Sequence, residues 1–270
     1  MKRFKPYLKI NLLFAFAFTL TFLCSCSLFT DHDKIISDII LDKAMSYLEQ
    51  NCSQEEFVID RVYYAFKSNC YRVEVSAPTG IDSHFHLDYD LDTYELRLDG
   101  YETDLLSGRN TYTRLVQGYD TTVADALGGI NGLLYLRGDL CRYSDTESHD
   151  RFFSPRGLVM KELILNHVYN MENIGREYGY IEITVQDEDL SVDRCLDRLL
   201  QIHEELTRKN GDYYVIALTM QNTVTEGEPE TLQIYGITQE VLFSEDPLTQ
   251  LQQMWVEQEM HRQKVKAQWD

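Results

Sequence analysis

The feature that most constrains the fold is a strict alternation of apolar and polar residues over residues 71–77 and again over residues 84–91. Successive side chains of a strand point to opposite faces, so a period of two gives each segment one apolar face and one polar face. Pro78 and Gly80 separate the segments, which predicts two antiparallel strands that bury one face and expose the other. The residues of the apolar face are Tyr71, Val73, Val75, Ala77, Phe85, Leu87, Tyr89 and Leu91.

A helix and two further strands are expected around this pair. Asp33 is a typical N-cap for a helix that runs to Gln50, because its carboxylate can accept hydrogen bonds from the first turn. Residues 57–66 and 94–98 have the composition of strands on either side of the pair. One helix followed by an antiparallel meander is therefore the expected first half of the chain.

The first domain is expected to extend over residues 32–143. Residues 101–127 have apolar positions at helical spacing, although Gly118 is expected to interrupt them, and a short strand is expected over residues 133–136. The chain then turns polar, which predicts a linker over residues 144–156.

The second domain is expected over residues 157–243, and a C-terminal helix over residues 244–270. The elements expected in the domain are a helix from Gly157 to about Arg176, a strand over residues 180–185, a helix capped by Ser191, and strands over residues 213–221 and 231–237. His203 lies on the apolar face of its predicted helix and is expected to be a core histidine with satisfied hydrogen bonds; the alternative is a catalytic histidine. The predicted fold class is α+β, with two small helix-plus-antiparallel-sheet units and a C-terminal helix.

Residues 1–25 have the layout of a secretory signal. Four lysine and arginine residues lie within residues 1–9, and residues 12–23 follow as an apolar run without a charge. Twelve helical residues cover roughly 18 Å, which is short of the roughly 30 Å hydrocarbon core of a bilayer. This segment is therefore expected to enter the export machinery but to make a poor permanent anchor.

The end of this segment, Leu23-Cys24-Ser25-Cys26, resembles the lipobox of bacterial lipoproteins. The resemblance implies cleavage after Ser25 and a diacylglyceryl group on the thiol of Cys26, with residues 26–31 as a lipidated tether. Two acyl chains give stable anchoring, so the resemblance implies a location on the extracytoplasmic face of a cell membrane. The alternative is an ordinary signal peptide, or an uncleaved signal anchor, that ends in cysteines.

The composition is acidic. The formal net charge is -19, and it becomes about -23 without residues 1–25, which hold four cations and no acidic residue. Phosphate backbones repel such a body, so nucleic acid is not expected as a partner, and lipid is expected to hold the protein at the membrane. The 18 tyrosines, many of them on predicted strands, could serve contact with an envelope protein or a glycan.

Four further cysteines could form disulfides outside the cytoplasm, in three possible pairings. They are Cys52, Cys70, Cys141 and Cys195. A bridge between Cys52 and Cys70 is the least favourable, because these residues lie at opposite ends of a predicted strand. The alternative is that all four are small buried hydrophobic residues.

A second resemblance concerns the first domain. Residues 44–50, Ala-Met-Ser-Tyr-Leu-Glu-Gln, are followed by residues 55–59, Glu-Glu-Phe-Val-Ile, and a Tyr-rich hairpin. This pattern looks like the start of uncharacterised Gram-positive lipoproteins of the YfjL-like kind, over about residues 30–100. Cys52-Ser53-Gln54 stands where that group usually has a glycine. The resemblance implies no activity.

The sharpest candidate site is a run of alternating polar residues on one predicted strand. Asp82, His84, His86, Asp88 and Asp90 would project from the same face. Two imidazoles and a neighbouring carboxylate can share a divalent metal, so His84, His86 and Asp88 are the expected ligands. A further ligand would have to come from another element. The alternative is a solvated polar face.

Three hypotheses of function follow. The first is a non-catalytic, membrane-anchored binding or interaction protein of the cell envelope without a cofactor, because the sequence has no Gly-x-Ser-x-Gly, His-Glu-x-x-His or phosphate-loop motif. The second is a metal-dependent envelope enzyme that uses the face of His84 and His86. The third is an inhibitor or immunity-type protein, because one helix over an antiparallel meander resembles cystatin-like inhibitory folds.

Overall fold

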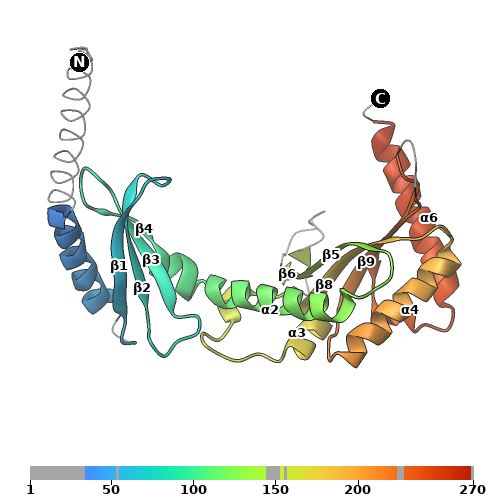
Figure 1. Cartoon of the computed structure of the whole chain (residues 1–270), viewed down its shortest axis with the longest axis horizontal. Coiled ribbons are helices and arrows are strands. Elements are labelled where there is room, and N and C mark those ends of the chain that lie inside the picture. The colour runs from blue at the N-terminus through green and yellow to red at the C-terminus, as the bar shows by residue number, and fades with distance from the viewer. Residues whose placement is uncertain (1–33, 53–54, 144–152, 155–156, 224–227, 269–270) are drawn as a thin grey trace, which may run out of the picture. The chain divides into compact units, whose positions relative to one another are not determined.

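The computed structural model describes residues 34–52, 55–143, 153–154, 157–223 and 228–268. Helices and strands are both abundant, so the predicted α+β fold class is confirmed. The chain divides into two compact units, unit 1 up to Leu106 and unit 2 from Ser107 (Figure 1). Within the described stretches, no helix is both long enough and apolar enough to cross a membrane.

Unit 1 is a helix beside a four-stranded antiparallel sheet (Figure 1). The described part of the helix covers residues 34–51. The strands are β1 (Val58–Ala65), β2 (Cys70–Ser76), β3 (His84–Tyr89) and β4 (Leu96–Asp99), followed by a π-helical turn, η1 (Tyr101–Leu106). Strands that follow each other in sequence are neighbours in the sheet. This is the helix and meander that the sequence predicted.

The two faces of this sheet are those that the alternation predicted. Val73 and Leu87 are fully buried, whereas His84 on β3 is exposed. Ile40 and Ala44 of the helix are also fully buried, and the helix shares a groove with Tyr89 of the apolar face. Burial of each large aliphatic side chain contributes about 1.5–3 kcal/mol, so the buried residues of the helix and of the sheet both stabilise unit 1.

Unit 2 is a second α+β layer structure. Its elements are α2 (Arg109–Leu127), β5 (Leu133–Leu140), β6 (Arg142–Tyr143), β7 (Phe153–Ser154), η2 (Met160–Glu162), α3 (Met171–Tyr178), β8 (Gly179–Gln186), α4 (Val192–Arg208), β9 (Val215–Gln221), β10 (Thr231–Ile237), α5 (Gln239–Leu242) and α6 (Pro247–Lys266). The strand order is β10-β9-β8-β5, and β6 pairs with β7 apart from this sheet. Strands β8 and β9 are parallel because α4 crosses over between them, while the other pairs of the four-stranded sheet are antiparallel.

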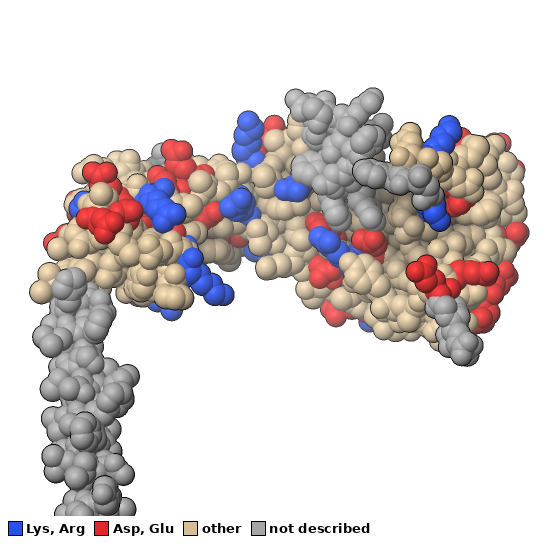
Figure 2. Space-filling model, turned by 90° about the horizontal axis from the view of Figure 1, so that it is seen from above, with Lys and Arg blue, Asp and Glu red and all other residues tan. Residues whose placement is uncertain are grey.

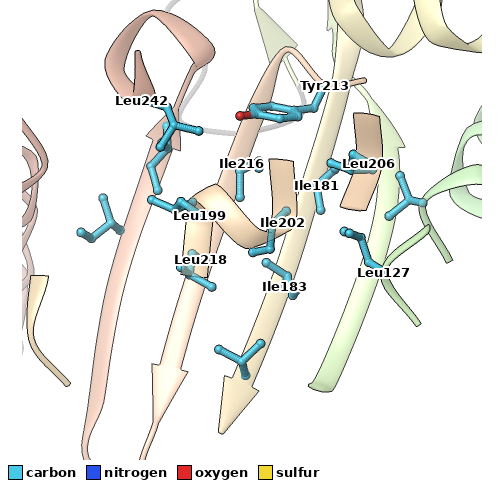
Figure 3. Packing of buried hydrophobic residues seen from close by; sticks show 14 of the residues in the cluster. Leu127, Ile181, Ile183, Leu199, Ile202, Leu206, Tyr213, Ile216, Leu218 and Leu242 are labelled. Carbon is cyan, nitrogen blue, oxygen red and sulfur yellow. The ribbon is translucent and has the colours of Figure 1, made fainter. Parts of the chain in front are cut away.

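The core of unit 2 lies between the sheet and α4 (Figure 3). Ile181 and Ile183 of β8 and Leu218 of β9 point toward Leu199 and Ile202 of α4, and all five are at most 1% exposed. The side chain of Ser191 accepts a hydrogen bond from the amide of Arg194 at 3.2 Å and so begins α4, as predicted.

The predicted domain boundary is wrong. Residues 32–143 do not form one domain, because α2 and β5 belong to unit 2, where β5 pairs with β8 over almost its full length. Most of the predicted linker, residues 144–152 and 155–156, lies outside the described residues. The sequence signal missed the boundary because the partner of β5 is about 45 residues further along the chain.

Two predicted helices also differ in the structure. Gly118 lies inside α2 without interrupting it, and the break falls earlier, at Gly108, whose φ of 75° favours glycine. Residues 157–176 do not form one helix: only η2 and α3 are helical there. Asn166 adopts a φ of 60°, which a helix cannot contain, and Asn170 caps α3 by accepting from the amide of Asn173.

Candidate functional site

The predicted metal ligands lie on the polar face of β3, but they do not form a metal site. Arg72 lies directly opposite Asp88 in the register of β2 and β3. Its Nε and Nη2 donate to the two carboxylate oxygens of Asp88 at 2.7 and 2.8 Å. Burial acts to raise the pKa of Asp88, but the hydrogen bonds and the charge of Arg72 outweigh it and lower that pKa. The carboxylate is therefore committed to a structural ion pair.

The two histidines of β3 have different surroundings. His86 Nδ1 lies 3.4 Å from Asp104 Oδ2 of η1, and its Nε2 lies 4.0 Å from Asp88 Oδ2. His84 is exposed at the start of the strand. Within the part of the chain that the structure describes, no group of three His, Cys, Asp or Glu side chains is placed to hold a metal ion. The predicted set of His84, His86 and Asp88 is thus corrected to a polar face with ion pairs.

The two other members of the predicted run have structural places. Asp82 is only 1% exposed in the connection between β2 and β3. Asp90 Oδ1 accepts from the amides of Asp92 at 2.9 Å and of Thr93 at 3.0 Å, which closes the turn after β3. Asp82 is therefore buried before the strand, and Asp90 closes the turn that follows it.

The four cysteines of the body, Cys52, Cys70, Cys141 and Cys195, are buried and carry free thiols. Burial, reinforced by the charge of Asp99, raises the pKa of Cys52 to about 11. Burial raises the pKa of Cys195 to about 12. A thiol that stays protonated is a poor nucleophile, so these residues act as small hydrophobic side chains. None of the three possible disulfide pairings is formed.

The core position of His203 on α4 is confirmed in part. Its ring packs edge-on against Phe243, with centroids 4.7 Å apart, and against Tyr213, with centroids 6.0 Å apart. The Nδ1 atom of His203 and the hydroxyl of Tyr213 are buried without a hydrogen-bond partner. The side chain therefore packs in the core, where its Nε2 lies 3.5 Å from the hydroxyl oxygen of Thr207 but its Nδ1 has no hydrogen-bond partner.

Unit 2 has a cavity of about 500 Å³ between residues 158–170 and α3. Leu158 and Ile174, which are 4% and 7% exposed, are the buried members of its lining. Leu163, Tyr169 and Tyr178 are half-buried and complete the apolar part of the wall. The cavity thus has an apolar base and two aromatic side chains.

The irregular segment that forms one wall is held by specific contacts. Arg114 of α2 donates to the carbonyl oxygen of His167 at 2.8 Å. The amide of Ile164 donates to the hydroxyl of Tyr169 at 2.8 Å. The rings of His167 and Tyr169 pack edge-on with centroids 4.6 Å apart. The cavity is therefore part of the fixed structure of unit 2.

The polar part of the cavity is acidic. Its lining includes the carboxylates Glu162 and Glu177, and no lysine or arginine among the described residues. Burial raises the pKa of Tyr178, and its hydrogen bond to Glu177 and the charges of Glu177 and Glu162 raise it further. Both carboxylates therefore affect the pKa of the same tyrosine in the cavity wall. Elsewhere acidic and basic side chains are interspersed on the face shown in Figure 2 rather than gathered into one basic patch.

Sequence reasoning missed this cavity because it predicted a continuous helix over residues 157–176. The available signal was the pair Asn166 and Asn170, since asparagine favours positive φ and N-cap positions. No protein-family model matches the chain, and no curated protein or solved structure matches it either. The resemblance to YfjL-like lipoproteins therefore stays a prediction.

Proposed function

We propose that the protein is a lipid-anchored, non-catalytic binding protein of the cell envelope. Lipid on Cys26 would hold it on the extracytoplasmic face of the membrane, and the cavity of unit 2 would bind a ligand that carries an ammonium group. The main support for a binding activity is the cavity itself, which combines an apolar base, two tyrosines and two carboxylates.

The size and the chemistry of the cavity support this proposal. Pockets for small ligands commonly measure about 300–1,000 Å³ and combine apolar walls with a few polar groups. An ammonium group is attracted by the faces of Tyr169 and Tyr178 and by the carboxylates of Glu162 and Glu177. The acidic mature body, with a charge of about -23, adds to this preference at long range.

The polar face of unit 1 gives less support to the alternative of a metal-dependent enzyme. Asp88 is held by Arg72, and Glu74 is held by Arg61 at 2.6 and 2.8 Å. A metal would have to displace these guanidinium groups. The inhibitor or immunity-type hypothesis rests on the helix and meander of unit 1 alone and stays a prediction.

The anchor is tested by mass spectrometry of the native protein extracted from membranes. The proposal expects a chain that begins at Cys26 and carries the mass of a diacylglyceryl group. An intact amino-terminal extension, or an unmodified thiol at Cys26, would contradict it.

The ligand class is tested by calorimetric titration with tri-lysine amide, with fully N-acetylated tri-lysine amide as the uncharged control. Each exposed carboxylate pair is worth about 0.2–1 kcal/mol, so the double variant Glu162→Gln/Glu177→Gln should weaken binding by about twofold to thirtyfold. Glu257→Gln, on the exposed side of α6, is the matched control and should bind like the unaltered protein. Equal binding of the acetylated peptide, or no loss in the double variant, would contradict the proposed ligand class.

A further inference from the structure

The turn between β1 and β2 carries the most exposed large apolar side chain among the described residues. Phe66 is 83% exposed. The ring of Tyr64, which is 43% exposed, packs edge-on against it with centroids 6.4 Å apart. Exposed aromatic pairs cost solubility, so their presence at the tip of a hairpin indicates a contact surface.

The geometry of the turn keeps these rings outward. The hydroxyl of Tyr64 donates to Asn69 Oδ1 at 2.8 Å across the turn. The amide of Ser68 donates to the carbonyl oxygen of Ala65 at 3.1 Å. Phe66 is therefore presented by a closed turn and does not fold back onto the sheet.

Two cations lie at the same turn. Lys67 directly follows Phe66 and is exposed. Arg97 of β4 donates from Nη1 to the carbonyl oxygen of Ser68 at 3.2 Å. Aromatic side chains beside lysine and arginine are typical of segments that lie in the headgroup layer of a bilayer.

The turn lies at the end of unit 1 where the described part of the N-terminal helix begins (Figure 1). The 18 residues 34–51 of the helix rise about 27 Å, and the eight residues of β1 return over about 26 Å. Seven residues lie between Cys26 and Lys34, so eight residue-to-residue steps join them, and a chain of that length reaches at most about 28 Å. A lipid on Cys26 would therefore hold this end of the unit close to the bilayer.

We propose that the aromatic tip formed by Tyr64, Phe66 and Lys67 inserts into the headgroup layer of the membrane that carries the anchor. This inference rests on the lipid anchor of the proposed function. The turn between β3 and β4 lies near the same end (Figure 1). It contains Asp92 and Glu95, whose carboxylates oppose an anionic surface. Insertion of the rings, and not the charge of the body, is the driving force, so the contact also forms on neutral lipid.

The test uses the full lipidated protein in phosphatidylcholine vesicles and in vesicles of phosphatidylcholine with phosphatidylglycerol. Trp255→Phe and Trp269→Phe remove the two tryptophans of the chain. One variant then adds Phe66→Trp. The matched control adds Ile81→Trp, because Ile81 is 51% exposed in the connection at the opposite end of the same sheet. Flotation of the vesicles reports the anchor, and quenching by brominated acyl chains reports the depth of each indole.

The proposal expects both variants to float with the vesicles, and the indole of Phe66→Trp to be quenched at least about twofold more than that of Ile81→Trp on both lipids. Flotation with equal quenching, or with no quenching of either indole, would overturn the membrane contact and leave the anchor intact. Quenching on the anionic vesicles alone would overturn insertion of the rings as the driving force. Failure to float would overturn the anchor and, with it, this inference.

Discussion

Substitution of Gly179 by alanine should destabilise unit 2 through one buried contact. Gly179, at the junction of α3 and β8, has φ of -66° and ψ of 125°, which any residue can adopt. A Cβ atom at this position would overlap the hydroxyl of Tyr119 and lie 2.5 Å from the carbonyl oxygen of Gly175. Tyr119 is fully buried and donates to the carbonyl oxygen of Asp212 at 2.9 Å, so it has no room to move aside.

The size of the effect follows from three terms. Restriction of the unfolded chain favours alanine by about 0.4–1 kcal/mol. Overpacking of a filled core costs about 1–3 kcal/mol, and disturbance of the hydrogen bond between Tyr119 and Asp212 costs about 1 kcal/mol more. Gly179→Ala should therefore lower the free energy of unfolding of unit 2 by about 1–3.5 kcal/mol. Tyr119→Phe alone should cost about 1 kcal/mol, because it removes the hydrogen bond and leaves the ring in place.

The double variant Gly179→Ala/Tyr119→Phe separates this contact from a general loss of packing. Removal of the hydroxyl relieves part of the overlap, so the double variant should be about 1 kcal/mol more stable than the sum of the single variants predicts. Both tryptophans of the chain, Trp255 and Trp269, belong to the sequence of unit 2, so their fluorescence in urea reports its unfolding. Additivity of the two substitutions within about 0.3 kcal/mol would refute the reasoning.

Three further outcomes are expected. Tyr213→Phe should change the stability of unit 2 by less than about 1 kcal/mol in urea unfolding, because the hydroxyl that it removes is buried without a partner; a larger loss would reveal a partner in solution. Arg72→Met should destabilise unit 1 by about 2–3 kcal/mol at pH 7, as measured by circular dichroism. Because Arg72 lowers the pKa of Asp88 below its ordinary value of 3.8, this difference should be full above that pH and shrink as the pH falls through the folded pKa; a constant difference would contradict the ion pair. The four buried cysteines of the body should not react with a thiol reagent at pH 8 until denaturant is added, and rapid reaction of any of them would contradict their burial.

The faces of the unit 1 sheet could be predicted from sequence because side-chain direction in a strand is a local property. The partners across the strands could not, because residues 77–83 connect β2 and β3 and are too many to fix the register as a tight turn does. A shift of two residues would place Glu74 opposite Asp88 instead of Arg72. The sequence therefore predicted the polar face of β3 correctly, but not the ion pair between Arg72 and Asp88 on that face.

The two glycines of the α2 region show where local propensity fails. Gly118 costs the helix only about 1 kcal/mol, which the packing of α2 against β5 and α4 exceeds. Gly108 is required for a tertiary reason, because a Cβ atom there would overlap the carbonyl oxygen of Met160. Residues 163–170 show the same limit, since contacts from Arg114 and Tyr169 hold a chain segment that spacing alone assigned to a helix.

The two edges of the unit 2 sheet bear on how this unit can bind a partner. At the β5 edge, Asp120 of α2 accepts from the amide of Gly138 at 2.7 Å, and Tyr112 donates to the carbonyl oxygen of Leu140 at 3.1 Å. At the β10 edge, Gln258 of α6 both accepts from the amide of Tyr235 at 3.0 Å and donates to its carbonyl oxygen at 2.9 Å.

These side chains already form hydrogen bonds with backbone groups that an added strand would need. Strand addition is therefore opposed at both edges. A partner of unit 2 must then recognise side chains. Among the described residues, the cavity between η2 and α3 brings apolar, aromatic and charged side chains together and so offers the groups that such recognition needs.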